Sequence, residues 1–480
     1  QESDLADFRA GKRDVVRASF QTEYTLPHDI TLAASYGFDQ AAQNTVYDPD
    51  RTDVENTYAV LPAISHSWQA EVRLQSGQDQ RVRWLLGYSR FQGEWETQQL
   101  AYQINTAVGG AIPRVGVQNP PRVDDTADTP AVFGSIEGDL LPNLTIGGEV
   151  RRQTDKQSSL NADLVTRTNY ELTNTMPRYY VRYSPIPDLN LYVTYGKGVT
   201  PGQLNGNWNS YSASQQAEIC TQFPTSCGGA IAKEPTVENY ELGIKQRLLE
   251  GRLQYSLAAY KMDWNDVNTV VTVIVSTTPF AVPFVVRNNA KLKGIEFEGT
   301  FLITDAWSVD LSATLQKNEY TLFYNPAIST LTSGRTYYTN NEVPKQPDKT
   351  AVLSSTYRGK LNDNWRWYVR GDAMYTGKMW DSEANIFQLG GHTKVNLRFG
   401  FDSEKMSVEA YGRNIFNDKH WMYAARSTSL SEPGALLQVR NQPGWFGYNP
   451  ANPNAVTTVQ GLMLNAPDKP EYGVRVTYRF

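Results

Sequence analysis

Hydrophobic and polar residues alternate with a period of two along much of this chain. Between residues 307 and 316, every odd position is apolar, whereas the even positions are Ser, Asp, Thr and Gln. The same alternation runs through 189–196, 395–401 and 472–480, and the last apolar face ends on Phe480. Successive side chains of a β-strand point to opposite faces, so each segment predicts a strand with one apolar and one polar face. About 17 such segments follow one another, which predicts an all-β protein.

The connections between these segments alternate strictly between short and long. In an antiparallel up-and-down meander, every second connection lies at the same end, so the long loops share one rim and the tight turns the other. This sorting is typical of a transmembrane β-barrel with long extracellular loops and short periplasmic turns, and a β-sandwich has no reason for it. The short turns are 26–29, 76–79, 141–143, 185–188, 250–251, 304–305, 361–364 and 403–405; the long connections are 43–63, 96–127, 155–168, 200–235, 265–283, 321–346, 377–391 and 414–470.

The polar faces carry Arg, Glu, Asp and Asn, whereas the apolar faces carry almost no charge. A packed core does not accept such side chains unpaired, so we expect the polar faces to line a wet lumen and the apolar faces to contact lipid. No run of about 18 apolar residues exists, which excludes a spanning helix. The mean hydropathy of −0.50 is compatible with a barrel, because its strands interleave polar and apolar positions. The 28 Tyr and 11 Trp residues suit aromatic girdles, although other β-rich proteins are also rich in aromatics.

The chain offers little for metal, cofactor or catalytic chemistry. Its two cysteines, Cys220 and Cys227, lie in a polar stretch without a nearby histidine, which favours a disulfide formed in an oxidising compartment. The sequence contains no Gly-rich phosphate loop, no G-x-S-x-G and no H-E-x-x-H, so we expect neither an enzyme nor a metal or cofactor site. A net charge of −5 without a basic stripe gives no indication of nucleic-acid binding.

Five stretches resemble motifs of TonB-dependent receptors, the plugged active transporters of Gram-negative outer membranes. They occur in the order of the family over residues 190–480, and together they are more specific than each motif alone. The resemblance implies that the closing strand, with Tyr478 and Phe480, is the signal read by the outer-membrane assembly machinery. The matching stretches are YGKGVTPG at 195–202, KEPTVENYELGIK at 233–245, KGIEFEG at 293–299, YGRNIFND at 411–418 and the closing strand 470–480.

The resemblance also sets an expected size. Barrels of such transporters have 22 strands around a plugged lumen, and an antiparallel meander closes only with an even number of strands. The chain has about 17 strand segments, and we find neither a plug domain nor a TonB-box peptide in it. We therefore expect residues 1–480 to form one transmembrane β-barrel domain that is incomplete at its N-terminus. An open wall between the first and last strands follows from this expectation.

Aromatic residues in the long loops are the candidate ligand contacts. Exposed rings at a barrel mouth can stack on a siderophore, a corrin or a sugar. Alternatively, they anchor the barrel at the membrane interface or pack the loops together. The candidates are Trp208, Tyr211, Phe223, Tyr337, Tyr338, Trp380, Trp421, Tyr423 and Trp445. Lumen-facing arginines either attract an anionic chelate or pair with carboxylates of the wall; these are Arg182, Arg366, Arg370, Arg398 and Arg475.

The resemblance implies an outer-membrane transporter that captures a scarce nutrient, foremost a ferric siderophore, at its extracellular loops. Import would use energy supplied by the TonB complex through the plug. The expected partners are therefore outer-membrane lipid, the small-molecule ligand and the TonB-type energising complex. Three alternatives stay open: a carbohydrate or vitamin B12 uptake receptor, a passive porin-like channel, and a surface adhesin.

Overall fold

The structure, a computed structural model, describes most of the chain. The described residues are 11–47, 57–98, 100–105, 110–113, 123–160, 166–205, 208–224, 227, 229–274, 281–326, 328, 332, 334–427, 461–465 and 467–479. They are nearly all β-structure, as the period-two alternation predicts. In this part of the chain, no helix is long and apolar enough to cross a lipid bilayer.

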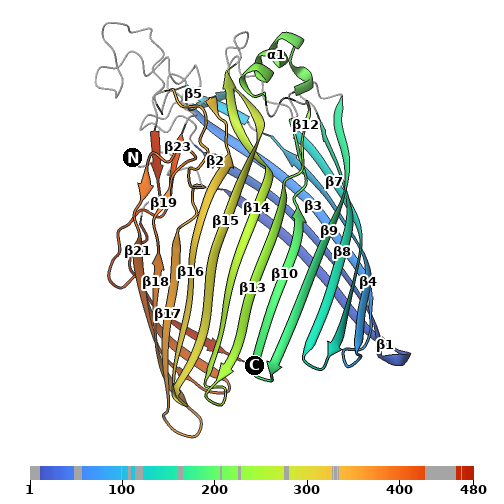
Figure 1. Ribbon diagram of the computed structural model, residues 1–480. Coiled ribbons are helices and arrows are strands. Elements are labelled where there is room, and N and C mark those ends of the chain that lie inside the picture. The colour runs from blue at the N-terminus through green and yellow to red at the C-terminus, as the bar shows by residue number, and fades with distance from the viewer. Residues whose placement is uncertain are drawn as a thin grey trace.

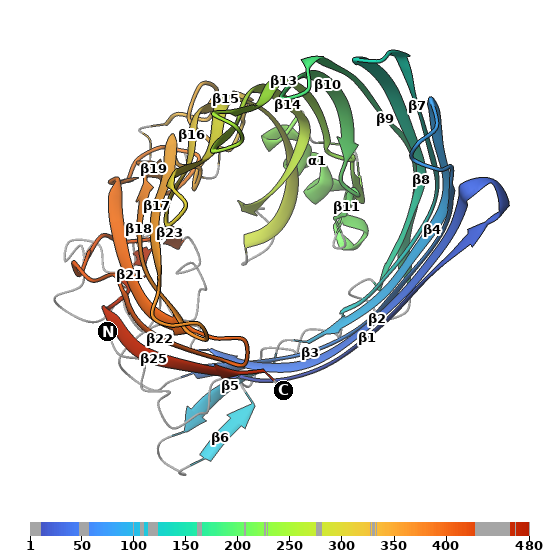
Figure 2. The ribbon, with the colours of Figure 1, turned by 90° about the horizontal axis from the view of Figure 1, so that it is seen from below.

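One antiparallel sheet of 19 strands forms the molecule. Two of its strands, β5 (Leu100–Asn105) and β6 (Gly110–Pro113), form a hairpin that branches from the edge of the wall. The others follow one another around the wall (Figures 1 and 2). They are β1 (Lys12–Leu26), β2 (Ile30–Tyr47), β3 (Thr57–Gln75), β4 (Val82–Thr97), β7 (Val123–Leu141), β8 (Leu144–Leu160), β9 (Arg167–Ile186), β10 (Leu189–Val199), β13 (Thr236–Leu248), β14 (Leu253–Ile274), β15 (Ala281–Thr304), β16 (Trp307–Leu322), β17 (Lys349–Lys360), β18 (Arg366–Thr376), β21 (His392–Asp402), β22 (Met406–Arg413) and β25 (Glu471–Tyr478).

The smaller elements lie in the long connections, apart from one turn. They are the strand pairs β11 (Gln203–Leu204) with β12 (Ile231–Ala232), β19 (Met379–Trp380) with β20 (Gln388–Leu389), and β23 (Ala424–Ser427) with β24 (Gly461–Leu464), the helix α1 (Ala213–Gln222), and the 3-10 turn η3 (Trp208–Ser210). The 3-10 turn η2 (Pro27–Asp29) makes the first tight turn between wall strands. All eight expected short turns connect consecutive wall strands, and Figure 1 shows these turns at the lower rim.

Several strands are longer than the sequence pattern predicts. The expected long connection 265–283 is mostly strand, because β14 and β15 continue to the pair Ile274 and Ala281. A β-bulge between Trp264 and Val267 separates this extension from the wall. The extension packs against loop residues instead of lipid, so its hydrophobic pattern differs from that of the wall and resembles a loop in the sequence.

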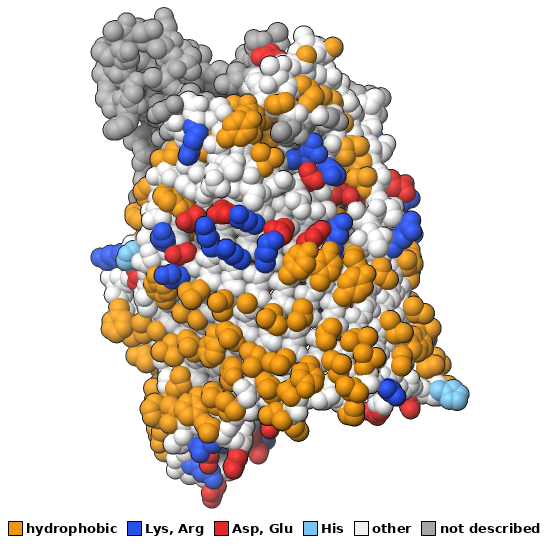
Figure 3. Space-filling model, in the orientation of Figure 1, with side chains coloured by type: hydrophobic (Ala, Val, Ile, Leu, Met, Phe, Trp, Pro, Cys, Tyr) orange, Lys and Arg blue, Asp and Glu red, His pale blue; other side chains and the backbone are white. Residues whose placement is uncertain are grey.

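The outer face of the wall is apolar over a broad band, as Figure 3 shows. Large hydrophobic side chains at Val193, Leu242, Ile295, Leu315 and Leu397 are exposed on it. Exposure of so many apolar groups is unfavourable in water but favourable in lipid. The predicted outward faces of β10, β16 and β21 are therefore confirmed.

The inner face contains a recurring three-strand unit, in which a tyrosine crosses a glycine to reach a polar side chain on the far strand. Tyr368 of β18 stands opposite Gly400 of β21, which stands opposite Glu409 of β22. The Tyr368 hydroxyl donates a hydrogen bond of 2.6 Å to the Glu409 carboxylate. A Cβ at Gly400 would lie 2.5 Å from the Tyr368 ring, so only glycine leaves room for this crossing. The same unit joins Tyr180 over Gly147 to Glu137 and Tyr260 over Gly294 to Gln316, with O···O distances of 2.7 Å and 3.2 Å.

The two terminal wall strands each have one neighbour. Among the described residues, β1 pairs with β2 and β25 pairs with β22, and the ladder contains no pairing between β1 and β25. The wall is therefore open at this position over the described part of the chain. This agrees with the expectation that an odd number of antiparallel strands does not close on itself.

Replacement of Gly400 by valine should destabilise the barrel. The added side chain displaces the Tyr368 ring from its hydrogen bond, and overpacking of this kind costs about 1–3 kcal/mol. Thermal unfolding in detergent, followed by heat-modifiable gel migration, measures the change. Gly371→Val is the matched control, because the nearest atom to its added Cβ is a Leu397 methyl at 3.7 Å. Equal midpoints for the two variants would contradict the role assigned to the glycine.

Candidate ligand site at the barrel mouth

Helix α1 lies inside the ring of strands when the barrel is viewed along its axis (Figure 2). It begins with a capping box, in which the Ser212 hydroxyl accepts from the Gln215 backbone N–H and the Gln215 side chain accepts from the Ser212 backbone N–H. A disulfide joins Cys220 in its last turn to Cys227. The sequence analysis did not predict this helix, although Ser-x-x-Gln is a capping-box pattern that signals a helix start.

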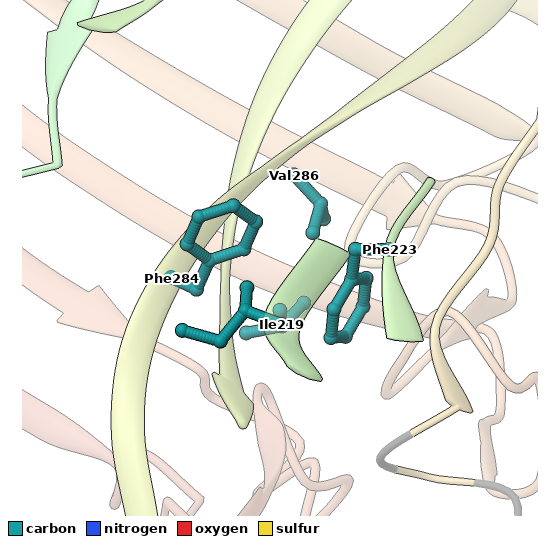
Figure 4. Close-up of a cluster of buried hydrophobic side chains, with 5 residues drawn as sticks. Ile219, Phe223, Phe284 and Val286 are labelled. Atoms are coloured by element: carbon teal, nitrogen blue, oxygen red, sulfur yellow. The ribbon is translucent and has the colours of Figure 1, made fainter. Parts of the chain in front are cut away.

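A hydrophobic cluster holds α1 against the extension of β14 and β15 (Figure 4). Ile219 and Phe223 of the helix end contact Phe284 and Val286, and the ring centroids of Phe223 and Phe284 are 5.9 Å apart. Val271 completes this cluster of buried side chains. Each large apolar side chain that leaves water contributes about 1.5–3 kcal/mol. The helix is therefore fixed to the hairpin rather than held as a loose loop.

A second cluster packs the connection between β16 and β17. Tyr338 is fully buried there with Tyr320 and Phe323. Its hydroxyl donates to the Arg335 carbonyl at 2.6 Å, and the Arg335 guanidinium lies 4.7 Å from the ring centre. Burial raises the pKa of the Tyr338 hydroxyl. The ring thus acts as a packing centre for this loop.

Two of the candidate aromatics differ from the expected exposure. Phe223 is 1% exposed and Tyr338 is 0% exposed, so neither ring can stack on an incoming ligand in this conformation. Both pack loops together, which was the alternative interpretation of the loop aromatics. Trp208 and Tyr211 are half-buried against the first cluster.

Other candidates do present a ring surface to solvent. Tyr337 is 53% exposed and Trp421 is 43% exposed. Trp380 and Tyr423 are half-buried, and Trp445 lies outside the described residues. The aromatic surface available to a ligand is therefore smaller than the sequence suggests.

Lys345 connects two of the long loops. Its ammonium donates to the Tyr423 hydroxyl at 2.8 Å and lies 4.5 Å from the centre of the same ring. The backbone N–H of Lys345 donates to the Trp380 carbonyl at 2.9 Å. The sequence analysis missed this lysine because its partner is distant in the chain and no local pattern connects them. These contacts bring a cation to two of the aromatic candidates, the Tyr423 ring and the backbone of Trp380.

The predicted lumen arginines are mostly paired with carboxylates. Asp372, which is buried, accepts from Arg370 at 2.8 Å and from Arg398 at 3.2 Å. Arg182 lies 2.8 Å from Glu137 and Arg475 lies 3.8 Å from Glu409. Arg366 stands opposite Asp402 in the strand register. Charge on the inner wall is therefore largely balanced within the wall, and the lumen is lined by a polar network.

In the loop after β22, hydrogen bonds fix the position of the Asp418 carboxylate. The Asp418 carboxylate accepts from the backbone N–H of His420 at 2.9 Å and lies 2.5 Å from the His420 ring nitrogen. Burial opposes ionisation of Asp418, but the hydrogen bonds from His420 outweigh it and hold the pKa of Asp418 below its usual range. Asn414 braces the same turn through its side chain, which accepts from the Asp418 backbone N–H at 2.8 Å. In the described part of the chain, no group of three or more His, Cys, Asp and Glu side chains could hold a metal ion.

Phe223→Ala should release α1 from the hairpin. Loss of a buried phenylalanine costs about 3–5 kcal/mol in a packed site, so amides of residues 213–222 should exchange with solvent faster by more than a hundredfold. Hydrogen exchange followed by mass spectrometry measures this directly. Tyr357→Ala removes an exposed ring of β17 beside the tight turn to β18, far from this cluster, and should leave the exchange of α1 unchanged. Equal protection of α1 in both variants would show that the cluster does not hold the helix.

Comparison with known proteins gives the chain its family. Residues 2–415 match the family described as TonB dependent receptor-like, beta-barrel. Over 263 residues, the chain is 20% identical to the probable TonB-dependent siderophore receptor PiuA of Acinetobacter baumannii, a match that covers 54% of this chain and 32% of the relative. The chain therefore spans only 32% of the length of this curated relative.

Two solved structures share this fold. The ferric yersiniabactin uptake receptor FyuA from Yersinia pestis has a TM-score of 0.70 at 15% identity, covering 98% of this chain and 62% of that chain. BauA, the ferric preacinetobactin receptor from A. baumannii, has a TM-score of 0.65 at 16% identity, covering 98% of this chain and 63% of that chain. At such identities the likeness establishes the fold. Because the family match extends over most of its length, the chain belongs to the TonB-dependent receptor-like β-barrel family, whose members are outer-membrane proteins.

Proposed function

We propose that this chain is the barrel of an outer-membrane transporter that captures a ferric siderophore at its extracellular loops. Import would draw energy from a TonB-type complex, as in the family. The observation that carries the proposal is the mouth itself: exposed rings of Tyr337 and Trp421 and the paired Lys345 and Tyr423 lie above a polar-lined barrel. An aromatic surface beside a cation suits a ligand with flat chelating groups and negative charge.

The relatives support a siderophore over other nutrients. PiuA is named a probable TonB-dependent siderophore receptor, FyuA a ferric yersiniabactin uptake receptor and BauA a ferric preacinetobactin receptor. A low sequence identity does not transfer a particular ligand, so the proposal is limited to the ligand class. The mouth adds the chemistry that the class requires, because rings and a cation can contact an anionic aromatic chelate at the same time.

The inner wall supports transport rather than adhesion. Its ion pairs centre on Asp372 and Glu137 and leave a polar surface along the lumen without a large excess of one charge. A polar lumen is the path that a hydrophilic chelate needs once it leaves the mouth. An adhesin that only binds protein at its loops does not need such a path.

Removal of the exposed rings should weaken ligand binding. For Tyr337→Ala combined with Trp421→Ala, the loss of two aromatic contacts predicts a Kd raised about five- to a hundredfold, at about 0.5–1.5 kcal/mol per ring. Fluorescence quenching with a panel of ferric siderophores, cobalamin and oligosaccharides measures binding and identifies the class. Tyr357→Ala, which removes an exposed ring on β17 close to the tight turn between β17 and β18, is the control and should bind as the wild type does. Binding of oligosaccharide or cobalamin but of no siderophore would refute the proposed ligand class.

Uptake should depend on the proton gradient of the inner membrane. Cells expressing the full-length protein should take up radiolabelled ferric siderophore, and a protonophore should abolish the uptake, because the outer membrane has no energy source of its own. Growth under iron starvation with and without the gene is the matching control. Uptake that persists after collapse of the gradient would favour a passive channel.

A further inference from the structure

Three lysines face one another directly on the outer surface of the wall. Lys261 of β14 is in register with Lys293 of β15, which is in register with Lys317 of β16. We call these residues the lysine ladder. Adjacent strands lie about 4.8 Å apart, so the three side chains leave the sheet as one short row. Like charges directly opposite each other destabilise a sheet, and such a row therefore calls for a compensating anion.

The protein supplies only part of that compensation. The Lys261 ammonium lies 2.6 Å from Asp263, and the Lys317 ammonium lies 3.0 Å from Glu319. Glu319 is shared, since Lys291 lies 2.7 Å from its other oxygen. The Lys293 side chain is exposed and makes no ion pair or hydrogen bond within the described residues. The positive charge of Lys293, at the centre of the ladder, is therefore not neutralised by a carboxylate of the described residues.

The ladder lies at the border of the apolar band. The next outward row toward the tight turns is Ala259, Ile295 and Leu315, in the same strand register. On the neighbouring strand β13, Tyr240 is in register with Lys261 and lies at the same height as the ladder. The Tyr240 ring packs in a tilted arrangement against Tyr195 at a centroid distance of 5.0 Å, and Tyr195 stacks with Tyr179 at 6.3 Å. Tyrosines in a row are typical of the interface between lipid and water.

Figure 3 shows the corresponding arrangement on this face, with Lys, Arg, Asp and Glu gathered directly above the hydrophobic band. Other lysines of this belt differ from the ladder. Lys156 stands opposite Glu171 and Lys197 stands opposite Glu238. Those lysines meet an opposite charge across the strand, whereas the ladder places cation against cation. The excess is local and not a general property of the belt.

We propose that the lysine ladder binds the phosphate-bearing head group of a lipid of the outer leaflet. The phosphates lie against Lys261, Lys293 and Lys317, and the acyl chains lie along Ile295 and Leu315. Ammonium groups are strong phosphate binders, and a row about 10 Å long accommodates a head group with more than one phosphate. The apolar row directly beneath places the site at the bilayer surface, where a lipid reaches both parts at once. The inference does not depend on the transported ligand.

The test uses the purified full chain in neutral detergent with added lipid A, a glycolipid with two phosphates. Its thermal midpoint is followed as lipid A is titrated, which gives an apparent Kd by linkage. The double variant Lys293→Gln with Lys317→Gln should bind roughly 30-fold more weakly, at about one factor of five per lysine near a lipid surface. The double variant Lys156→Gln with Lys197→Gln removes the same charge from lysines that face glutamates. It should stay within roughly threefold of the wild type.

Two measurements on the wild-type protein keep the proposal testable even where a variant folds poorly. Dephosphorylated lipid A should give no shift, and raised salt should weaken the shift with lipid A because exposed charges are screened. Equal weakening in the two double variants would overturn the assignment to the ladder. A midpoint shift of the same size with inorganic phosphate alone would show a free-anion site and overturn the lipid assignment.

Discussion

Lipid offers no hydrogen bonds to a backbone, and this constraint governs the whole architecture. Every N–H and C=O within the membrane must find its partner inside the protein. In the wall, a continuous series of antiparallel ladders from β1 to β25 pairs these backbone groups between neighbouring strands. Because the ladders fix each strand in register with its neighbours, side chains of one height form rows around the molecule. The apolar band, the tyrosine row and the lysine ladder are all consequences of that alignment.

The inner face solves a different problem. Polar side chains there must be satisfied without filling the lumen, and the tyrosines that cross glycines lie flat along the wall while reaching carboxylates or amides on a further strand. Glycine at the crossing point removes the Cβ that would lift the ring away. Such units connect strands side chain to side chain, in addition to the backbone ladder. A wide barrel without a packed core gains cohesion from them.

Much of this could be predicted from local pattern. Alternation over 307–316 fixes which side chains of β16 face lipid, and turns such as 250–251 follow from polar and glycine residues between two strands. The candidate site was less accessible to such reasoning. Whether Phe223 is exposed depends on Phe284, and whether Tyr423 is free depends on Lys345, and both partners are distant in the chain. Periodicity describes how a strand divides two environments, but it contains no information on which loops meet above the membrane.

The attachment of α1 has a mechanical consequence. The helix is joined to the outer ends of β14 and β15 by buried contacts, and those same strands continue, through a bulge between Trp264 and Val267, down to the tight turns. A force applied to α1 from outside is therefore transmitted to β14 and β15 rather than absorbed by a flexible loop. Any widening of the entrance must come from the segments around it, or else bend the two longest strands of the wall.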